Sequence, residues 1–273
     1  MYLEYWQLAS RPFESIVDRG SFFASGIHEG ALSKLRYAVE NQRGAVLLAG
    51  PAGSGKTTLI QLLRQDLDKR FAPFAHLVFP QMSSRDLLVY LADQLGAPPA
   101  DPPRHTIEES ISRIEFVLQR GAEQGLHAVV AVDEGHLLED CGLLETMRLL
   151  LNFESAGRPT LTLLLVGQMG LVSAVGRLPS LEERVSVKML LRSFVVEETA
   201  AYVRHRLAAA GALREIFTPD AIEAVHYLSH GVARQINRLG DLALLVGFAD
   251  RLPKISATEI EAVSEELIAV AAA

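Results

Sequence analysis

The chain has 273 residues and a mass of 29.8 kDa, with 49% hydrophobic and 22% charged residues. These proportions are typical of a soluble globular protein with one large domain or two small ones. The formal net charge of -7 disfavours bulk attraction to polyanions, although a local basic face is compatible with it. The longest apolar runs are of strand length and fall short of the roughly 18 residues of a membrane span, and the N-terminus does not resemble a signal peptide. We therefore expect a cytoplasmic protein without a membrane-spanning segment.

The only cysteine is Cys141. A single cysteine excludes an internal disulfide and an all-cysteine metal site. Glu139 and Asp140 precede it, and their negative charge disfavours a reactive thiolate. We assign Cys141 no function.

Short apolar segments alternate with amphipathic segments up to about Arg192. Strands are predicted at residues 45–49, 74–79, 127–133, 160–166 and 186–190. After Arg192 the spacing is helical throughout, with helices predicted at residues 196–210, 219–229, 233–246 and 257–270. Alternation followed by helices predicts a parallel α/β domain over residues 1–192 and a small all-α lid domain over residues 193–273.

A phosphate-binding motif follows the first predicted strand. It reads G-x-x-x-x-G-K-T and consists of Gly50, Pro51, Ala52, Gly53, Ser54, Gly55, Lys56 and Thr57, with Thr58 next in the helix. The backbone N–H groups of such a loop surround the β-phosphate, and the following helix contributes the positive end of its dipole. We expect Lys56 to reach the β- and γ-phosphates and Thr57 to ligate Mg²⁺. The sequence therefore predicts a P-loop that binds Mg-ATP.

Two carboxylates end the strand predicted at 127–133, in the manner of a Walker B motif. Asp133 is expected to hold Mg²⁺, and Glu134 to polarise the water that attacks the γ-phosphate. A further strand lies between the two motif strands in the sequence, as in additional-strand ATPases. This arrangement disfavours a GTPase or a simple nucleoside kinase, and no acceptor signature indicates a phosphotransferase.

Three polar residues downstream are candidates for contact with the γ-phosphate. Gln168 ends an apolar strand and is the candidate for the residue called sensor 1. The alternative is a polar strand end that makes a hydrogen bond to a nearby loop. Arg184 precedes the last strand and is the candidate arginine finger acting in trans, or else it forms a surface salt bridge to a nearby glutamate. Arg234, with Arg238 as its alternative, is the candidate lid sensor, or else it is a solvated helix residue.

The chain as a whole resembles the ATPase domain of the general secretion pathway protein A (ExeA) family, within the AAA+ superfamily and close to its origin-recognition-like members. The matching segments include residues 1–6, Pro12 and Phe13, residues 28–32, Val166 to Gln168 and Arg234 to Arg238. The family's N-terminal segment packs by the adenine. The resemblance therefore implies that Tyr5, Pro12 and Phe13 contact the base, although these residues fit a hydrophobic staple equally well.

The resemblance is compatible with two kinds of partner: a component of a secretion system, or a transposase together with DNA. The resemblance implies that secretion proteins of this type continue into a membrane span and a peptidoglycan-binding region, which we do not expect here, whereas similar stand-alone ATPases assemble on DNA and regulate a transposase. From Arg184 to Leu239 there are eight Lys/Arg against five Asp/Glu, a weak sign of DNA binding. His136 completes a helicase-like D-E-x-H sequence, and it either couples hydrolysis to a partner or is satisfied by its surroundings.

These observations together predict an AAA+ ATPase. It is expected to bind and hydrolyse Mg-ATP as a ring or filament of identical subunits and so to drive the assembly or remodelling of a protein partner. The alternative is an ATP-dependent, DNA-binding regulator of a transposase, in which slow hydrolysis times an assembly switch.

Overall fold

The computed structural model describes residues 1–14, 20, 22–99, 106–140 and 142–272, and Cys141 lies outside them. The chain divides into two compact units. An α/β unit comprises Ile27–Gly50 and Lys56–Leu191, and a helical unit comprises Met1–Gly26, Pro51–Gly55 and Arg192–Ala273. In this division the last segment of the helical unit begins at Arg192. The first 26 residues, however, group with the C-terminal helices, for the packing reasons given below.

The described part of the α/β unit contains a five-stranded parallel sheet of strand order β2-β3-β6-β1-β7. The strands are β1 (Ala45–Ala49), β2 (Phe74–Leu77), β3 (Ala128–Val132), β6 (Leu161–Gly167) and β7 (Val185–Leu190). Every residue of β1, β3 and β6 is buried, as expected of parallel strands that are covered on both faces. The predicted α/β class, with a parallel sheet of the additional-strand type, is confirmed, because β6 lies between β1 and β3.

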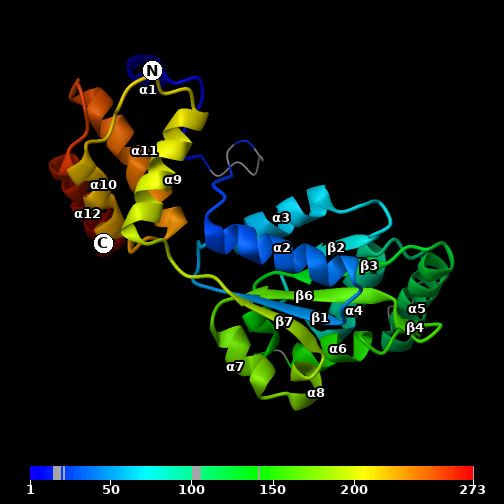
Figure 1. Ribbon diagram of the computed structural model, residues 1–273. Coiled ribbons are helices and arrows are strands. Elements are labelled where there is room, and N and C mark those ends of the chain that lie inside the picture. The colour runs from blue at the N-terminus through cyan, green and yellow to red at the C-terminus, as the bar shows by residue number, and fades with distance from the viewer. Residues whose placement is uncertain (15–19, 21, 100–105, 141, 273) are drawn as a thin grey trace. The chain divides into compact units, whose positions relative to one another are not determined.

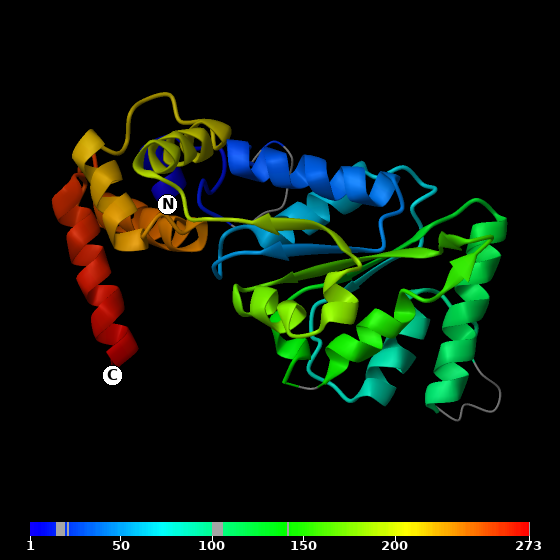
Figure 2. The same ribbon diagram turned by 60° about the horizontal axis from the view of Figure 1, so that its bottom comes forward.

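Helices cover both faces of this sheet (Figures 1 and 2). Helices α2 (Gly26–Glu40) and α3 (Lys56–Asp66) lie on one face. The opposite face carries α4 (Ser84–Gln94), α5 (Ile107–Glu123), α6 (Leu143–Leu150), α7 (Gly170–Gly176) and α8 (Pro179–Glu182). A two-stranded antiparallel ribbon joins β4 (Glu154–Ser155) to β5 (Arg158–Pro159). Alternate residues of β1 (Ala45, Leu47 and Ala49) belong to the apolar core on the second face.

The strand register brings the ends of three strands to one edge of the sheet. Ala49 pairs with Gly167, and Val132 pairs with Leu165. The residues that follow β1, β3 and β6 therefore leave the sheet at the same carboxyl edge. Ligand sites of open parallel sheets lie at this edge.

Strand β2 ends at Leu77, two residues before its predicted end. The Asp133 N–H donates to the Leu77 carbonyl at 2.8 Å, after which β3 leaves the sheet. Because β2 is an edge strand, it has no other neighbour to pair with, and Val78 and Phe79 are exposed.

The helical unit consists of α1 (Tyr2–Trp6), α9 (Val196–Ala209), α10 (Pro219–Ser229), α11 (Ala233–Ala249) and α12 (Ala257–Ala272). The four predicted C-terminal helices are present. Helix α1, from the other end of the chain, lies beside α11 (Figure 1). Among the described residues, none of the helices is both long and apolar enough to cross a membrane.

Aromatic packing and one buried arginine attach the N-terminal segment to the C-terminal helices. Trp6 is completely buried, and its indole Nε1 donates to the Leu244 carbonyl at 2.9 Å. Arg206 is also buried, and its guanidinium donates to the backbone carbonyls of Pro12 and Glu14. A buried guanidinium needs such acceptors. Residues 1–14 therefore complete the core of this unit, although the sequence places them at the start of the α/β domain.

Candidate nucleotide-binding site

The P-loop links the end of β1 to the start of α3. Gly53 has a φ of 77° and Gly55 a φ of 92°, values in the left-handed region that glycine adopts without a steric cost. The helix begins at Lys56, as predicted. Lys56 is 6% exposed, and its ammonium donates to the Gly50 carbonyl at 3.0 Å. This bond holds the Lys56 ammonium against the first residue of the loop.

A hydroxyl and a carboxylate converge beside Lys56. Thr57 Oγ1 donates to Asp133 Oδ2 at 2.5 Å, and Asp133 Oδ1 accepts the Glu134 N–H at 2.9 Å. Mg²⁺ prefers hard oxygen ligands and keeps several waters, so one or two protein oxygens with phosphate oxygens are enough to bind it. This pair of oxygens, predicted as the metal ligands, fits Mg²⁺.

A histidine that the sequence analysis did not single out faces the same carboxylate. His76, in β2, has its Nε2 3.9 Å from Asp133 Oδ2, and this atom makes no hydrogen bond among the described residues. Burial lowers the pKa of His76, the Asp133 carboxylate raises it and Arg64 lowers it further. The net shift is downward, which favours a neutral imidazole beside the candidate metal ligand. The pairing of β2 with β3, which no local pattern reveals, is what brings His76 to this place.

Glu134 has an unusual backbone conformation. Its φ of 49° and ψ of 33° lie in the left-handed region, and it precedes the short 3₁₀ helix η1 (Gly135–Leu138). Residues other than glycine rarely adopt this region, and strain of this kind concentrates at functional sites. The carboxylate side chain is 45% exposed. It is therefore accessible to water directly beside the candidate metal ligand.

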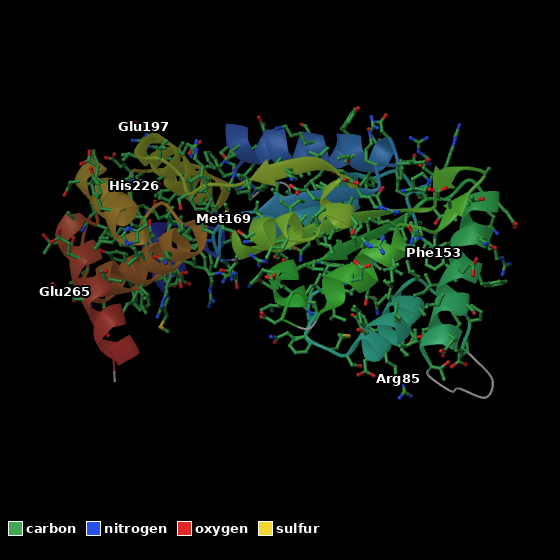
Figure 3. All side chains as sticks on the ribbon, turned by 90° about the horizontal axis from the view of Figure 1, so that it is seen from below. Arg85, Phe153, Met169, Glu197, His226 and Glu265 are labelled. Atoms are coloured by element: carbon green, nitrogen blue, oxygen red, sulfur yellow. The ribbon has the colours of Figure 1, made fainter. Side chains whose placement is uncertain are left out.

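Gln168 follows β6, between the ends of β1 and β3, as expected of a sensor. Its side-chain Nε2 lies 3.3 Å from Nε2 of His136, and its backbone N–H donates to His136 Nδ1 at 3.4 Å. Met169, which follows it and is labelled in Figure 3, is half exposed at the start of α7. The structure thus brings Gln168 together with His136 and Glu134 at the carboxyl edge.

Two glycines allow this close approach. A Cβ atom on Gly167 would lie 3.0 Å from the His136 backbone nitrogen, and one on Gly135 would lie 3.2 Å from the Val166 carbonyl oxygen. Neither glycine has a positive φ. The requirement is therefore for space between η1 and the end of β6.

We expect Gly167→Ala to destabilise the protein by about 1–3 kcal/mol, because the added methyl group must displace backbone atoms. Urea denaturation measures this difference. Gly176→Ala is the matched control, since its Cβ meets no described atom within 4 Å. Equal stability of the two variants would show that η1 can shift to accommodate the added methyl group without a loss of stability.

Arg184 lies at the other edge of the sheet. It precedes Val185, which pairs with Ala45 at the start of β1, whereas the P-loop follows the end of β1. Its guanidinium donates to Asn152 Oδ1 at 2.7 Å, while the nearby Glu182 pairs with Lys188. The structure therefore does not bring Arg184 together with Lys56 in the same subunit.

The remaining predicted residues belong to the helical unit. The Arg234 N–H donates to the Gly53 carbonyl at 3.3 Å, and a Cβ on Gly53 would lie 2.7 Å from Arg234 Cβ. Arg238, one turn later, is exposed. Of the two arginines, Arg234 is the one that contacts the P-loop segment of this unit.

Tyr5, Pro12 and Phe13 also take part in the helical unit. The Tyr5 hydroxyl donates to the Leu252 carbonyl at 2.7 Å, and its ring meets Phe248 edge-on. Phe13 is 4% exposed and packs edge-on against Phe217, while the Pro12 carbonyl accepts from Arg206. Each of the three residues therefore has a partner within its own unit.

A parallel sheet with β6 between the P-loop strand and the strand of the paired carboxylates defines an additional-strand P-loop protein of the AAA+ class. The chain belongs to the AAA domain family, whose model matches residues 39–175.

Similarity extends over nearly the whole chain. General secretion pathway protein A of Aeromonas hydrophila is 33% identical over 98% of this chain, which spans 48% of that protein. The Aeropyrum pernix ORC2 protein, solved in ADPNP-ADP complexes, has a TM-score of 0.70 at 16% identity and aligns over 94% of this chain and 71% of its own. Drosophila ORC bound to DNA also has a TM-score of 0.70, at 18% identity, over 97% of this chain and 66% of the other. The resemblance that the sequence indicated is confirmed.

Proposed function

We propose that the chain binds Mg-ATP at the P-loop and hydrolyses it to drive the assembly or remodelling of a partner complex. The observation that carries the proposal is the contact of 2.5 Å between Thr57 and Asp133, beside the buried Lys56 and directly before Glu134. A hydroxyl and a carboxylate for the metal ion, an ammonium group for the phosphates and a second carboxylate for the attacking water are the groups that ATP hydrolysis at a P-loop uses.

Each group has a separate role. Lys56 binds the β- and γ-phosphates, with the backbone of Gly50 to Gly55, while Thr57 and Asp133 hold Mg²⁺, Asp133 in part through water. The bound ion supplies positive charge that neutralises the phosphates. Glu134 takes the proton of the attacking water, and Gln168 contacts that water or the γ-phosphate. The closeness of Arg234 to Gly53 supports a role for Arg234 as the lid sensor.

The position of Arg184 supports action in trans. Arg184 lies at the edge of the sheet opposite to the P-loop of its own subunit, so any contact of its guanidinium with a nucleotide would be with that of another copy. The proposed active form is therefore a homo-oligomer.

The DNA-binding alternative has one structural observation in its favour. Arg204, Arg234 and Arg238 are exposed, and exposed basic side chains are the groups that contact phosphates. In the same region Arg192 pairs with Glu198, and Lys188 with Glu182, which leaves less basic surface than the sequence count indicates. Size measurement and negative-stain imaging with and without nonhydrolysable ATP, each with and without duplex DNA, separate a DNA-templated filament from a DNA-indifferent ring.

The nucleotide site itself is tested with Lys56→Ala. We expect this variant to bind ATP about 10- to 100-fold more weakly than the parent, the loss of one or two charge-assisted hydrogen bonds. Equilibrium binding of a fluorescent ATP analogue measures the difference, and release of inorganic phosphate by the parent protein tests hydrolysis. Lys69→Ala, at an exposed lysine after α3, is the control. Unchanged affinity in Lys56→Ala would exclude the P-loop as the nucleotide site.

A further inference from the structure

The imidazole of His136 lies between Glu134, the candidate base, and Gln168, the candidate sensor. His136 Nδ1 lies 3.5 Å from Glu134 Oε2, and Nε2 of the same ring lies 3.3 Å from Gln168 Nε2. Both neighbours already have proposed roles in hydrolysis, whereas the proposed function assigns none to His136.

The hydrogen-bonding capacity of the ring limits what it can do. A neutral imidazole has one N–H donor and one acceptor nitrogen. With the proton on Nδ1, the N–H faces the Glu134 carboxylate across 3.5 Å, an electrostatic contact longer than a hydrogen bond, and Nε2 accepts from the Gln168 amide. With the proton on Nε2, Nδ1 accepts the Gln168 backbone N–H at 3.4 Å and Glu134 loses its partner. Nδ1 cannot donate toward Glu134 and accept from the Gln168 N–H at once.

The first arrangement is favoured. An N–H directed at an ionised carboxylate is attracted more strongly than one directed at a neutral acceptor, and a small rotation of the exposed Glu134 side chain shortens the 3.5 Å separation to a hydrogen bond. The bond between the Gln168 N–H and His136 is exposed, so water can replace it at little cost. In this arrangement the imidazole links the Glu134 carboxylate to the Gln168 side chain.

The backbone fixes the ring in this place. Because η1 and the end of β6 already lie as close as Gly135 and Gly167 allow, the His136 backbone cannot move further toward Gln168 without displacing main-chain atoms. Leu138, in the same short helix, is completely buried and anchors it to the core. The ring therefore has a defined position relative to both partners.

We propose that His136 is a positioning residue that holds the Glu134 carboxylate and the Gln168 amide in fixed relation, so that base and sensor engage the γ-phosphate together. The proposal rests on the proposed hydrolysis of ATP at this site. Its physical basis is that a displacement of about 1 Å in a catalytic group costs on the order of 10²-fold in rate. Because phosphate binding is assigned to Lys56 and the P-loop backbone, we expect His136 to affect turnover rather than nucleotide affinity.

The test compares His136→Ala and His136→Asn with the parent for kcat, KM, affinity for a nonhydrolysable ATP analogue and thermal stability. We expect His136→Ala to lower kcat by about tenfold or more, with affinity and KM within about twofold of the parent. His136→Asn keeps a side-chain N–H donor near Glu134 but does not reach Gln168, so its kcat should be intermediate. His230→Asn, which removes an exposed imidazole from the helical unit, is the matched control.

A double-mutant cycle with Gln168→Ala adds a readout that a space-filling role would not move. If the ring acts through the sensor, His136→Ala in the Gln168→Ala background should cost clearly less than in the parent. Additive losses, or a kcat in His136→Ala within twofold of the parent, would overturn the proposal. So would losses of kcat that merely follow losses of affinity and stability. A parent protein that binds ATP but releases no phosphate would instead refute the proposed hydrolysis, so the two failures are distinguishable.

Discussion

Glu134→Gln should bind Mg-ATP as tightly as the parent and lose about 10²- to 10⁴-fold of its turnover. The amide has the shape of the carboxylate but cannot accept the proton of the attacking water, and this range is the usual contribution of a general base. The neighbouring Asp133 and Thr57 stay intact, so the metal ligands are unaffected. Phosphate release at saturating ATP and equilibrium binding of the nucleotide measure the two quantities separately.

Glu123→Gln, at an exposed position of α5, is the isosteric control and should behave like the parent. Hydrolysis by Glu134→Gln at the parent rate would show that another group activates the water. A loss of nucleotide affinity in proportion to the loss of turnover would indicate that Glu134 is a metal ligand, as proposed for Asp133, and not the general base.

Arg184→Ala should bind ATP nearly normally and lose about 10³-fold or more of its turnover, because arginine fingers contribute 10³- to 10⁵-fold to phosphoryl transfer. The missing charge belongs to the site of a neighbouring subunit. A mixture of Arg184→Ala with Glu134→Gln should therefore recover activity, since an interface can combine an intact Glu134 from one chain with an intact Arg184 from the other. Phosphate release as a function of mixing ratio measures the recovery.

Asn152→Ala separates this role from a local structural one. Arg184 donates to the Asn152 side chain, so a purely structural arginine would make Asn152→Ala as inactive as Arg184→Ala. Arg158→Ala, at an exposed position of β5, controls for loss of charge. Two outcomes would exclude Arg184 as an arginine finger in trans. One is a mixture that stays inactive although hetero-oligomers are shown to form, and the other is normal turnover by Arg184→Ala alone.

Local sequence was sufficient to predict the five strands of the parallel sheet, apart from their exact ends. The apolar runs before Gly50 and Asp133 are buried on both faces, so their composition alone marks them as inner strands. The P-loop depends on eight consecutive residues, and its glycines and lysine have the conformations that the motif requires. These features follow from neighbouring residues and so can be read from a single sequence.

Features that depend on residues distant in the chain could not be predicted in this way. His76 faces Asp133 because β2 pairs with β3, and His136 meets Gln168 because β6 inserts beside β3. The attachment of the N-terminal segment to the C-terminal helices depends on Trp6 and on the buried Arg206. The partners of these side chains could not be predicted, because each of them lies in a distant part of the sequence.

The strand order also has a consequence for how the protein folds during synthesis. Ala45 of β1 pairs with Leu163 and Val185, and β3 pairs with β6, so both strands have partners that come later in the chain. A ribosome therefore completes the phosphate-binding loop long before the strands that support it have emerged. Non-local pairings of this kind slow folding, because the loops between the strands must close before any contact is gained. The facing edges of β1 and β3 stay unpaired until residues 161–167 are synthesised, and the second edge of β1 until residues 185–190 follow. Unpaired strand edges favour aggregation, so we expect the nascent chain to be most prone to it during that interval.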